Sequence, residues 1–291
     1  MKPEDFTYFC KLILDRTGLV LGPDKTYLIE SRITPVARKH NLGGLDGLAN
    51  TLRQGRSNDV LRDFTDALMT NESFFFRDTK PFDQFRDVVL PRLLASRAAA
   101  AKRIRIWSAA CSTGQEAYSL AMLLKEQGAK LAGWTIEITC TDISHEVLVR
   151  ARNGIYTQFE VQRGLPIQLL VKYFKQDGDK WQLTPEIRGM VKYKEFNLLA
   201  DPTGLGGFDV VFCRNVLIYF DQKAKTAILE RISRLLPPDG LLYLGGAETV
   251  LGVSDKFEPL AGHRGIYALT GQSGAQLATA APPAFARAVG A

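Results

Sequence analysis

Glu116 is the residue whose position most clearly suggests ligand chemistry, because it opens a predicted helix directly after a loop of small residues, 108–114. Small side chains let the backbone approach a ligand, and the N–H groups at the start of the helix are free to bind it. The loop has neither a Gly-x-Gly-x-x-Gly nor a Gly-Lys-Ser/Thr sequence, and a carboxylate on the first helical turn would repel a pyrophosphate. We therefore expect a cationic ligand here, and no dinucleotide.

A second acidic residue, Asp142, directly follows the predicted strand 135–141. In a doubly wound sheet, an acidic side chain after the second strand can accept hydrogen bonds from both ribose hydroxyls. The alternative is that Asp142 caps the helix that begins near Ser144, and the two residues can also divide these roles between them. His145 lies on that helix without another histidine nearby, so we expect a surface residue and no catalyst.

The segment 70–78 combines polar residues with three consecutive phenylalanines, 74–76, which are too apolar for an exposed linker. Asn71, Ser73 and Arg77 are interleaved with these rings, a composition expected where a hinge segment lies across a ligand pocket. The alternative is that the phenylalanines serve only in packing between domains and that Arg77 forms a surface ion pair.

Hydrophobic periodicity divides the chain into an N-terminal all-helical domain and an α/β domain. Apolar residues recur at helical spacing in 6–14, 26–40, 58–69 and 81–93, and Pro35 is expected to kink or restart the second of these helices. From residue 104 onwards predicted strands alternate with helices, which indicates a doubly wound, Rossmann-like parallel sheet. The predicted strands are 104–108, 135–141, 191–196, 208–213, 241–244 and 265–269.

The alternation breaks between residues 157 and 190, where an Asp177-Gly178 turn signal predicts a hairpin within a small antiparallel β insertion. We therefore predict a helical domain over 1–75, a linker and connecting helix over 76–102, and the α/β domain over 103–270. Residues 271–291 consist mainly of Ala, Gly, Pro and Ser with little to bury, so we predict a disordered tail there.

The composition is that of a globular protein with a sizeable core, since 46% of the 291 residues are hydrophobic and 23% are charged. No apolar run approaches the roughly 20 residues that span a bilayer, and the N-terminus lacks a signal-peptide core, so we expect a cytoplasmic protein. A net charge of +6 favours a partner of opposite sign, either nucleic acid or an acidic protein surface. The cysteines lack close metal-ligand spacing, so we predict neither a metal site nor a structural disulfide.

Four motifs together resemble the bacterial chemotaxis receptor glutamate O-methyltransferases of the CheR family. They are TNESFFFR at 70–77, WSAACSTGQE at 107–116, TDIS at 141–144 and FCRNVLIYFD at 212–221. Each motif alone is weak, but their order and spacing are specific, and the resemblance covers residues 1–270.

The resemblance implies an enzyme that binds S-adenosylmethionine, releases S-adenosylhomocysteine and methylates glutamate side chains of chemoreceptors during signalling adaptation. For such an acceptor, Arg77 and Tyr219 are our candidates for orienting the carboxylate, and the alternative is that Tyr219 only packs under the loop. By motif position it assigns cofactor contacts to Asn71, Ser73, Arg77, Glu116, Asp142, Asn197, Leu198, Asn215 and Val216.

The resemblance also implies a partner, the cytoplasmic helical bundle of a methyl-accepting chemoreceptor. In the family the second helix faces this bundle, which makes Arg32 and Arg38 the candidate docking residues. We expect a monomer that binds no nucleic acid and does not insert into the membrane. In some family members the β insertion grips a peptide at the receptor's C-terminus. The hairpin around Asp177-Gly178 looks shorter here, so we predict no strong binding of such a peptide.

The chemistry of this cofactor agrees with the residues identified independently. S-adenosylmethionine carries an ammonium that suits Glu116, a carboxylate that suits Arg77 and a ribose that suits Asp142. A glutamate acceptor with a pKa of about 4.3 is roughly 500-fold more ionised than protonated at pH 7, so it needs no general base. Transfer in line between an anion and a sulfonium then needs mainly alignment and exclusion of water.

Two other functions are open on the sequence. A nucleic-acid methyltransferase would explain the basic charge, but amino methylation of bases commonly uses an Asn/Asp-Pro-Pro-Tyr/Phe loop, whereas residues 215–218 read NVLI. A module that binds receptor or cofactor without turnover is disfavoured because Arg77, Glu116 and Asp142 are all present.

Overall fold

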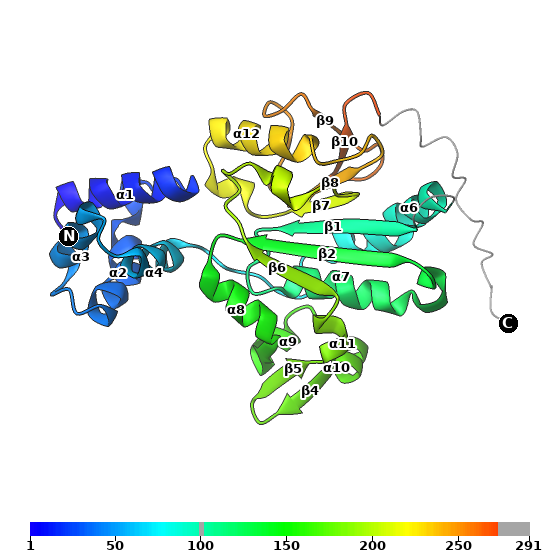
Figure 1. Cartoon of the computed structure of the whole chain (residues 1–291), viewed down its shortest axis with the longest axis horizontal. Helices are drawn as coiled ribbons and strands as arrows, with labels where there is room; N and C mark the ends of the chain where they lie inside the picture. Colours follow the sequence, from blue (N-terminus) through cyan, green and yellow to red (C-terminus); the bar gives the residue numbers. More distant parts are fainter. Residues whose placement is uncertain (99–101, 273–291) are drawn as a thin grey trace.

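The computed structural model describes residues 1–98 and 102–272, with the N-terminal helices beside a large sheet (Figure 1). These helices are α1 (Pro3–Thr17), α2 (Thr26–Lys39), α3 (Leu45–Gln54) and α4 (Asn58–Leu68). Their apolar faces meet in one cluster around Phe9, Ile33 and Phe64, all fully buried. Gly18 ends α1 in the left-handed conformation, and the Ser57 side chain caps the first turn of α4.

The predicted N-terminal helices are present, but the expected restart at Pro35 does not occur. Pro35 lies inside α2, which continues as one helix on both sides of it. The proline removes one backbone donor from the helix. Burial of Ile29 and Ile33 before it, and of Val36 and Ala37 after it, holds both halves of α2 against α3 and α4.

A helical segment connects these helices to the sheet. It consists of α5 (Lys80–Gln84), a π-helical stretch η2 (Phe85–Val89) and α6 (Leu90–Arg97), with Pro81 in the first turn as predicted. Phe82, Phe85 and Leu93 pack into the same apolar cluster as the sheet. The segment thereby anchors the chain just after residues 70–78.

The predicted doubly wound sheet is confirmed, with strands in the order β6-β2-β1-β7-β8-β10-β9. The first five run parallel, and β10 and β9 pair antiparallel. Strand β9 was not predicted, because it is only three residues long and ends in a proline. The bounds are β1 (Arg103–Ala109), β2 (Thr135–Asp142), β6 (Val191–Glu195), β7 (Val210–Cys213), β8 (Leu241–Leu244), β9 (Phe257–Pro259) and β10 (Ile266–Leu269).

 Strands β9 and β10 form an antiparallel hairpin, and β9 is the last strand at that side of the sheet.

Side chains of each buried strand alternate between two apolar layers, as the strand period of two requires. In β7, Val210 and Phe212 face one layer, whereas Val211 and Cys213 face the other. The first layer is covered by α7 (Gln115–Glu126) together with α5, η2 and α6, and the second by α12 (Gln222–Ser233). Figure 1 shows α7 and α12 on opposite sides of the sheet.

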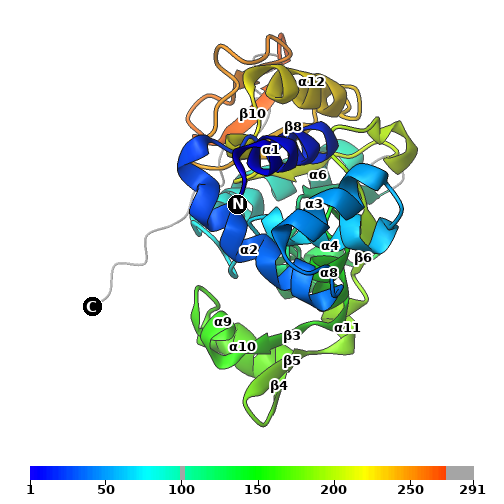
Figure 2. The ribbon, with the colours of Figure 1, turned by 90° about the vertical axis from the view of Figure 1, so that its left-hand side faces the viewer.

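The predicted antiparallel insertion is a three-stranded sheet in the order β3-β5-β4 (Figures 1 and 2). It begins at Ile155, and its hairpin turns at Gly178 as predicted. Its elements are β3 (Ile155–Thr157), α9 (Gln158–Gln162), α10 (Ile167–Tyr173), β4 (Phe174–Asp177), β5 (Lys180–Leu183) and α11 (Pro185–Arg188).

The remaining elements are α8 (His145–Asn153) and the short 3-10 turns η1 (Pro23–Lys25), η3 (Gly128–Leu131), η4 (Pro202–Leu205) and η5 (Leu217–Tyr219). None of the helices within 1–98 and 102–272 combines the length and apolarity that a membrane span requires. The domain limits at 75, 102 and 270 stay predictions. Residues 273–291, most of the predicted disordered tail, lie outside the described residues.

Candidate active site

One cavity lies where the carboxyl ends of β1, β2, β6 and β7 face the N-terminal helices. In open parallel sheets this edge is where ligands bind. Thr17, the last residue of α1, and Leu19, just after the helix, close the cavity from the helical side. Every residue predicted to contact cofactor or acceptor lines this cavity, namely Asn71, Ser73, Arg77, Glu116, Asp142, Asn197, Leu198, Asn215, Val216 and Tyr219. Their individual roles stay predictions.

The small-residue loop between β1 and α7 forms one wall, and its backbone is unusual. Ala110 and Ser112 have positive φ angles of 56° and 51°, which side chains other than glycine rarely adopt. The Ser112 hydroxyl donates to the backbone oxygen of Asn71 at 2.7 Å, and its N–H donates to Asp142 at 2.8 Å. The loop therefore ties the end of β2 to the 70–78 segment, and such local strain is often concentrated at binding sites.

Asp142 lies at the end of β2 and is 6% exposed. Its carboxylate accepts hydrogen bonds from the N–H groups of Ser112 at 2.8 Å and Ser144 at 3.0 Å. Burial raises the pKa of Asp142 above its usual value, although these hydrogen bonds oppose the shift. The capping role belongs to Ser144, whose side chain accepts from the N–H of Val147 at the start of α8. The helix cap is thus Ser144, and the ribose role of Asp142 stays a prediction.

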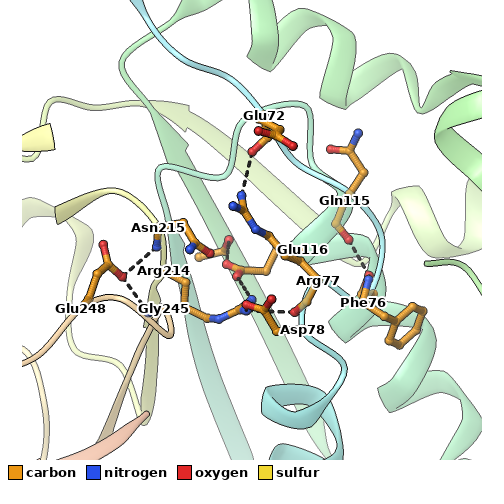
Figure 3. A network of polar contacts seen from close by, with 12 residues as sticks. Glu72, Phe76, Arg77, Asp78, Gln115, Glu116, Arg214, Asn215, Gly245 and Glu248 are labelled. Atoms are coloured by element: carbon orange, nitrogen blue, oxygen red, sulfur yellow. Dashed lines mark hydrogen bonds and ion pairs between the residues drawn. The ribbon is translucent and has the colours of Figure 1, made fainter. Parts of the chain in front are cut away.

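Glu116 is held by a partner that the sequence analysis did not assign to the site, Arg214 (Figure 3). Arg214 Nη1 donates to Glu116 Oε2 at 2.9 Å, and Ser108 Oγ donates to Oε1 at 2.8 Å. The Arg214 side chain is 1% exposed, and its Nη2 also donates to Asp78 Oδ2 at 2.7 Å and to the backbone oxygen of Arg77 at 2.9 Å. A charged residue directly after a fully buried strand was the signal that could have identified it.

Arg77 projects from the 70–78 segment and makes no ion pair within the described structure. Its guanidinium donates to the backbone oxygen of Glu72 at 3.0 Å (Figure 3). The guanidinium also lies 5.5 Å from the ring centre of Phe74. The surface ion pair considered as an alternative is therefore not formed. Phe75 is fully buried against Tyr156 and Phe174 of the insertion, at ring distances of 4.9 and 5.6 Å. Its burial anchors the segment across the cavity.

The loop after β7 carries Asn215, Val216 and Tyr219, and its conformation depends on Glu248, which the sequence analysis missed. Asn215 has a φ of 58°, and its N–H donates to Glu248 Oε2 at 2.8 Å. The side-chain oxygen Asn215 Oδ1 is buried and has no partner among the described residues. An unpaired buried acceptor on a cavity wall is a position where a polar ligand would be bound.

The remaining predicted residues join the sheet to the helices. The Asn197 side-chain amide donates to the backbone oxygen of Arg16 at 2.6 Å, and its oxygen accepts from the N–H of Leu199 at 2.9 Å. Leu198 is buried in the apolar layer of α12. Tyr219 packs against the N-terminal helical cluster, and its backbone oxygen accepts from the N–H of Val20 at 3.2 Å.

The two predicted docking residues lie outside the cavity and differ from each other. Arg38 is exposed near the end of α2. Arg32 is half-buried, and its Nη1 donates to the backbone oxygens of Leu68 at 2.9 Å and Met69 at 3.3 Å. Arg32 thus satisfies carbonyl groups at the end of α4, directly before the segment that lines the cavity.

The donors and acceptors of the cavity fit S-adenosylmethionine. Glu116 and Asp142 supply carboxylates, Arg77 supplies a cation, and Leu198 and Val216 supply apolar surface. A ligand with both signs of charge, two hydroxyls and a flat ring is complementary to such a set. No group of acidic, histidine or cysteine side chains suited to a metal ion occurs in residues 1–98 and 102–272.

The family model that matches this fold and cavity defines the chain as a methyltransferase that binds S-adenosylmethionine. The family model described as "CheR methyltransferase, SAM binding domain" matches residues 71–266, and "CheR methyltransferase, all-alpha domain" matches residues 4–69. The chain therefore belongs to the CheR methyltransferase family. The predicted family and cofactor are both confirmed.

Curated relatives cover almost the whole chain. Chemotaxis protein methyltransferase 1 of Pseudomonas aeruginosa is 40% identical over 262 residues, which are 87% of this chain and 93% of the relative. Chemotaxis protein methyltransferase 1 of Vibrio cholerae is 37% identical over 266 residues, covering 90% and 95%. A chemotaxis protein methyltransferase of Borreliella burgdorferi is 34% identical over 253 residues, covering 86% and 89%.

Proposed function

We propose that this protein transfers a methyl group from S-adenosylmethionine to glutamate side chains of chemoreceptors, which makes it a protein-glutamate O-methyltransferase. The relatives named as chemotaxis protein methyltransferases support the process. The observation that carries the carboxylate acceptor is Arg77, a cavity-lining cation without a carboxylate partner within the described structure, which the carboxylates of cofactor and acceptor would share. Such a group attracts and orients an anionic acceptor.

The cofactor supplies a methyl group on a sulfonium, and the chain supplies binding and alignment. Asp142 would accept from the ribose hydroxyls, and Glu116, fixed by Ser108 and Arg214, would face the ammonium. Arg77 and Tyr219 would orient the acceptor carboxylate at the same cavity. Hydrogen bonds within the chain fix the carboxylates of Glu116 and Asp142, so these groups need little reorganisation during transfer.

The cavity offers no evident general base, which suits an acceptor that is already ionised. None of the described residues that line it is a histidine. Burial raises the pKa of the Cys111 thiol well above its usual value, so this thiol is not a thiolate at neutral pH. The carboxylates of Glu116 and Asp142 already accept hydrogen bonds from the protein. A glutamate carboxylate requires no proton removal before methylation.

The proposed partner is the acidic helical bundle in the cytoplasmic part of a chemoreceptor, bound by a monomer without nucleic acid. A net charge of +6 would steer such a partner. Exposed Arg38 on α2 is the better docking candidate, because the guanidinium of Arg32 is engaged at the end of α4. Esterification removes one negative charge per glutamate and relieves repulsion between neighbouring helices, which is how adaptation would follow.

The experiment is incubation with methyl-labelled cofactor and a candidate receptor, followed by mild alkali. Esters release their label as methanol, so we expect the label to leave the receptor. Label that survives alkali would exclude a glutamate acceptor and favour methylation of nitrogen, in lysine or nucleic acid.

A further inference from the structure

Backbone N–H groups of the loop after β7 donate hydrogen bonds to Glu248, a residue of the loop after β8. Glu248 is only 9% exposed. Its carboxylate accepts hydrogen bonds from four successive backbone N–H groups of the loop after β7. Oε2 accepts from Asn215 at 2.8 Å, and Oε1 accepts from Val216 at 2.9 Å, Leu217 at 2.7 Å and Ile218 at 3.3 Å. Consecutive N–H groups that converge in this way form a concave anion site, which here is filled by the chain itself.

The same carboxylate joins this loop to the end of β8. Glu248 Oε2 also accepts from the N–H of Gly245 at 2.6 Å (Figure 3). A Cβ atom at position 245 would lie 2.9 Å from the backbone N of Asn215, as well as 2.7 Å from Asn215 Nδ2 and 2.8 Å from Glu248 Oε2, which is closer than such contacts allow. Only glycine therefore permits the two loops to approach while the carboxylate lies between them.

The loop needs such support because it has little regular structure of its own. It passes through the strained Asn215, with φ at 58°, and then forms only the short 3-10 turn η5. Without the Glu248 carboxylate, the N–H groups of this loop would be partly buried and unpaired, which is unfavourable. Asn215, Val216 and Tyr219 on this loop all line the cavity.

We propose that Glu248 is a positioning residue for methyl transfer, and that its carboxylate fixes the loop on which Asn215, Val216 and Tyr219 face the cavity. The proposal rests on the proposed function for the role of Tyr219, but the support of Asn215 and Val216 concerns cofactor binding alone. Glu248 itself is not among the residues that line the cavity.

The test is Glu248→Gln, which keeps the shape of the side chain but replaces one acceptor oxygen by an NH₂ group that faces N–H donors. Since a small misplacement of aligned groups can cost about 100-fold, we expect methyl transfer, read as S-adenosylhomocysteine formed, to fall about 10- to 100-fold. Cofactor affinity, read by calorimetry, should also fall measurably. Gly245→Ala, which forces the two loops apart by sterics alone, should reproduce both losses.

The control is Arg97→Met, which removes a partly buried ion network at the amino ends of β7 and β8, whereas the cavity lies at the carboxyl ends of the strands. Arg97 donates to Asp209 at 2.9 Å and to Asp239 at 2.6 Å, and these residues precede β7 and β8. It should lower the melting temperature while leaving turnover and cofactor affinity within about twofold below that temperature.

The proposal is overturned if Glu248→Gln keeps both wild-type turnover and wild-type cofactor affinity, or if the control loses them to the same extent. A wild-type protein that forms no alkali-labile ester would refute the proposed function only. Cofactor affinity in Glu248→Gln would still decide the positioning role in that case.

Discussion

Replacing Arg214 by methionine should destabilise the protein far more than replacing an exposed arginine. The change removes the hydrogen bonds to Glu116, Asp78 and the backbone oxygen of Arg77, and it leaves Glu116, whose side chain is 13% exposed, with only Ser108. A buried charge that loses its partner typically costs about 3–5 kcal/mol, which lowers the folding equilibrium constant by roughly 150- to 5000-fold.

Urea denaturation measures this cost, with Arg234→Met as the matched control. Arg234 pairs with Glu230 on the surface of α12 and is 64% exposed at the side chain, so its loss should change the free energy of unfolding by about 0.5 kcal/mol or less. Glu116→Gln removes the charge that Arg214 compensates. The double variant should therefore be more stable than the sum of the single losses predicts, by about 0.5–3 kcal/mol. Equal losses in the Arg214 and Arg234 variants, or strict additivity, would refute the argument.

The other predictions concern docking, cofactor binding, pH and the insertion. Arg38→Glu should strongly reduce receptor methylation at low salt and leave cofactor affinity within about twofold. Arg32→Glu should weaken both receptor methylation and cofactor affinity, because Arg32 supports the segment before the cavity. Wild-type methylation by Arg38→Glu would refute its docking role. Arg77→Ala or Asp142→Ala should weaken cofactor binding by about 2–5 kcal/mol, roughly 30- to 5000-fold, and unchanged calorimetric affinity would remove these residues from the pocket. Burial raises the pKa of Asp142, so its carboxyl group binds a proton more tightly in the folded state than in the unfolded state. This difference stabilises the folded state below about pH 3.9, and the stabilisation is lost as the pH rises through the raised pKa. The stability of the wild type relative to Asp142→Asn, without cofactor, should therefore decline as the pH rises above about 4, and a constant difference would contradict this. A receptor tail peptide should show no micromolar binding to the short β4–β5 hairpin in fluorescence anisotropy, and such binding would overturn the prediction.

Sequence reasoning located the cavity because its residues stand at strand ends, where topology alone brings them together. Glu116 follows the loop after β1, Asp142 ends β2, and Asn215 follows β7, so a parallel sheet places all of them on one edge. The burial of Phe75 was also predictable, because a run of phenylalanines cannot stay in water.

The partners of these residues could not be predicted in the same way. Arg214 reaches Glu116 across 98 positions of the chain, and Glu248 reaches Asn215 across 33. Periodicity reports which face a residue occupies, whereas a hydrogen bond depends on how two loops approach in space. The same limit explains why the hydrogen bond of Arg32 was not predicted. The sequence pattern places Arg32 on a basic face of α2, whereas in the structure its guanidinium donates to the backbone oxygen of Leu68 at the end of α4.

The central claim is that this cavity methylates a carboxylate, and the most direct test is to locate the methyl group. The protein is incubated with S-adenosylmethionine and a purified receptor cytoplasmic fragment, and peptides of the receptor are sequenced by mass spectrometry without exposure to alkali. We predict added methyl groups on glutamate side chains, absent when the same reaction uses Arg77→Ala. Methyl groups on lysine, arginine or an amide instead, or no difference between the two enzymes, would contradict the account.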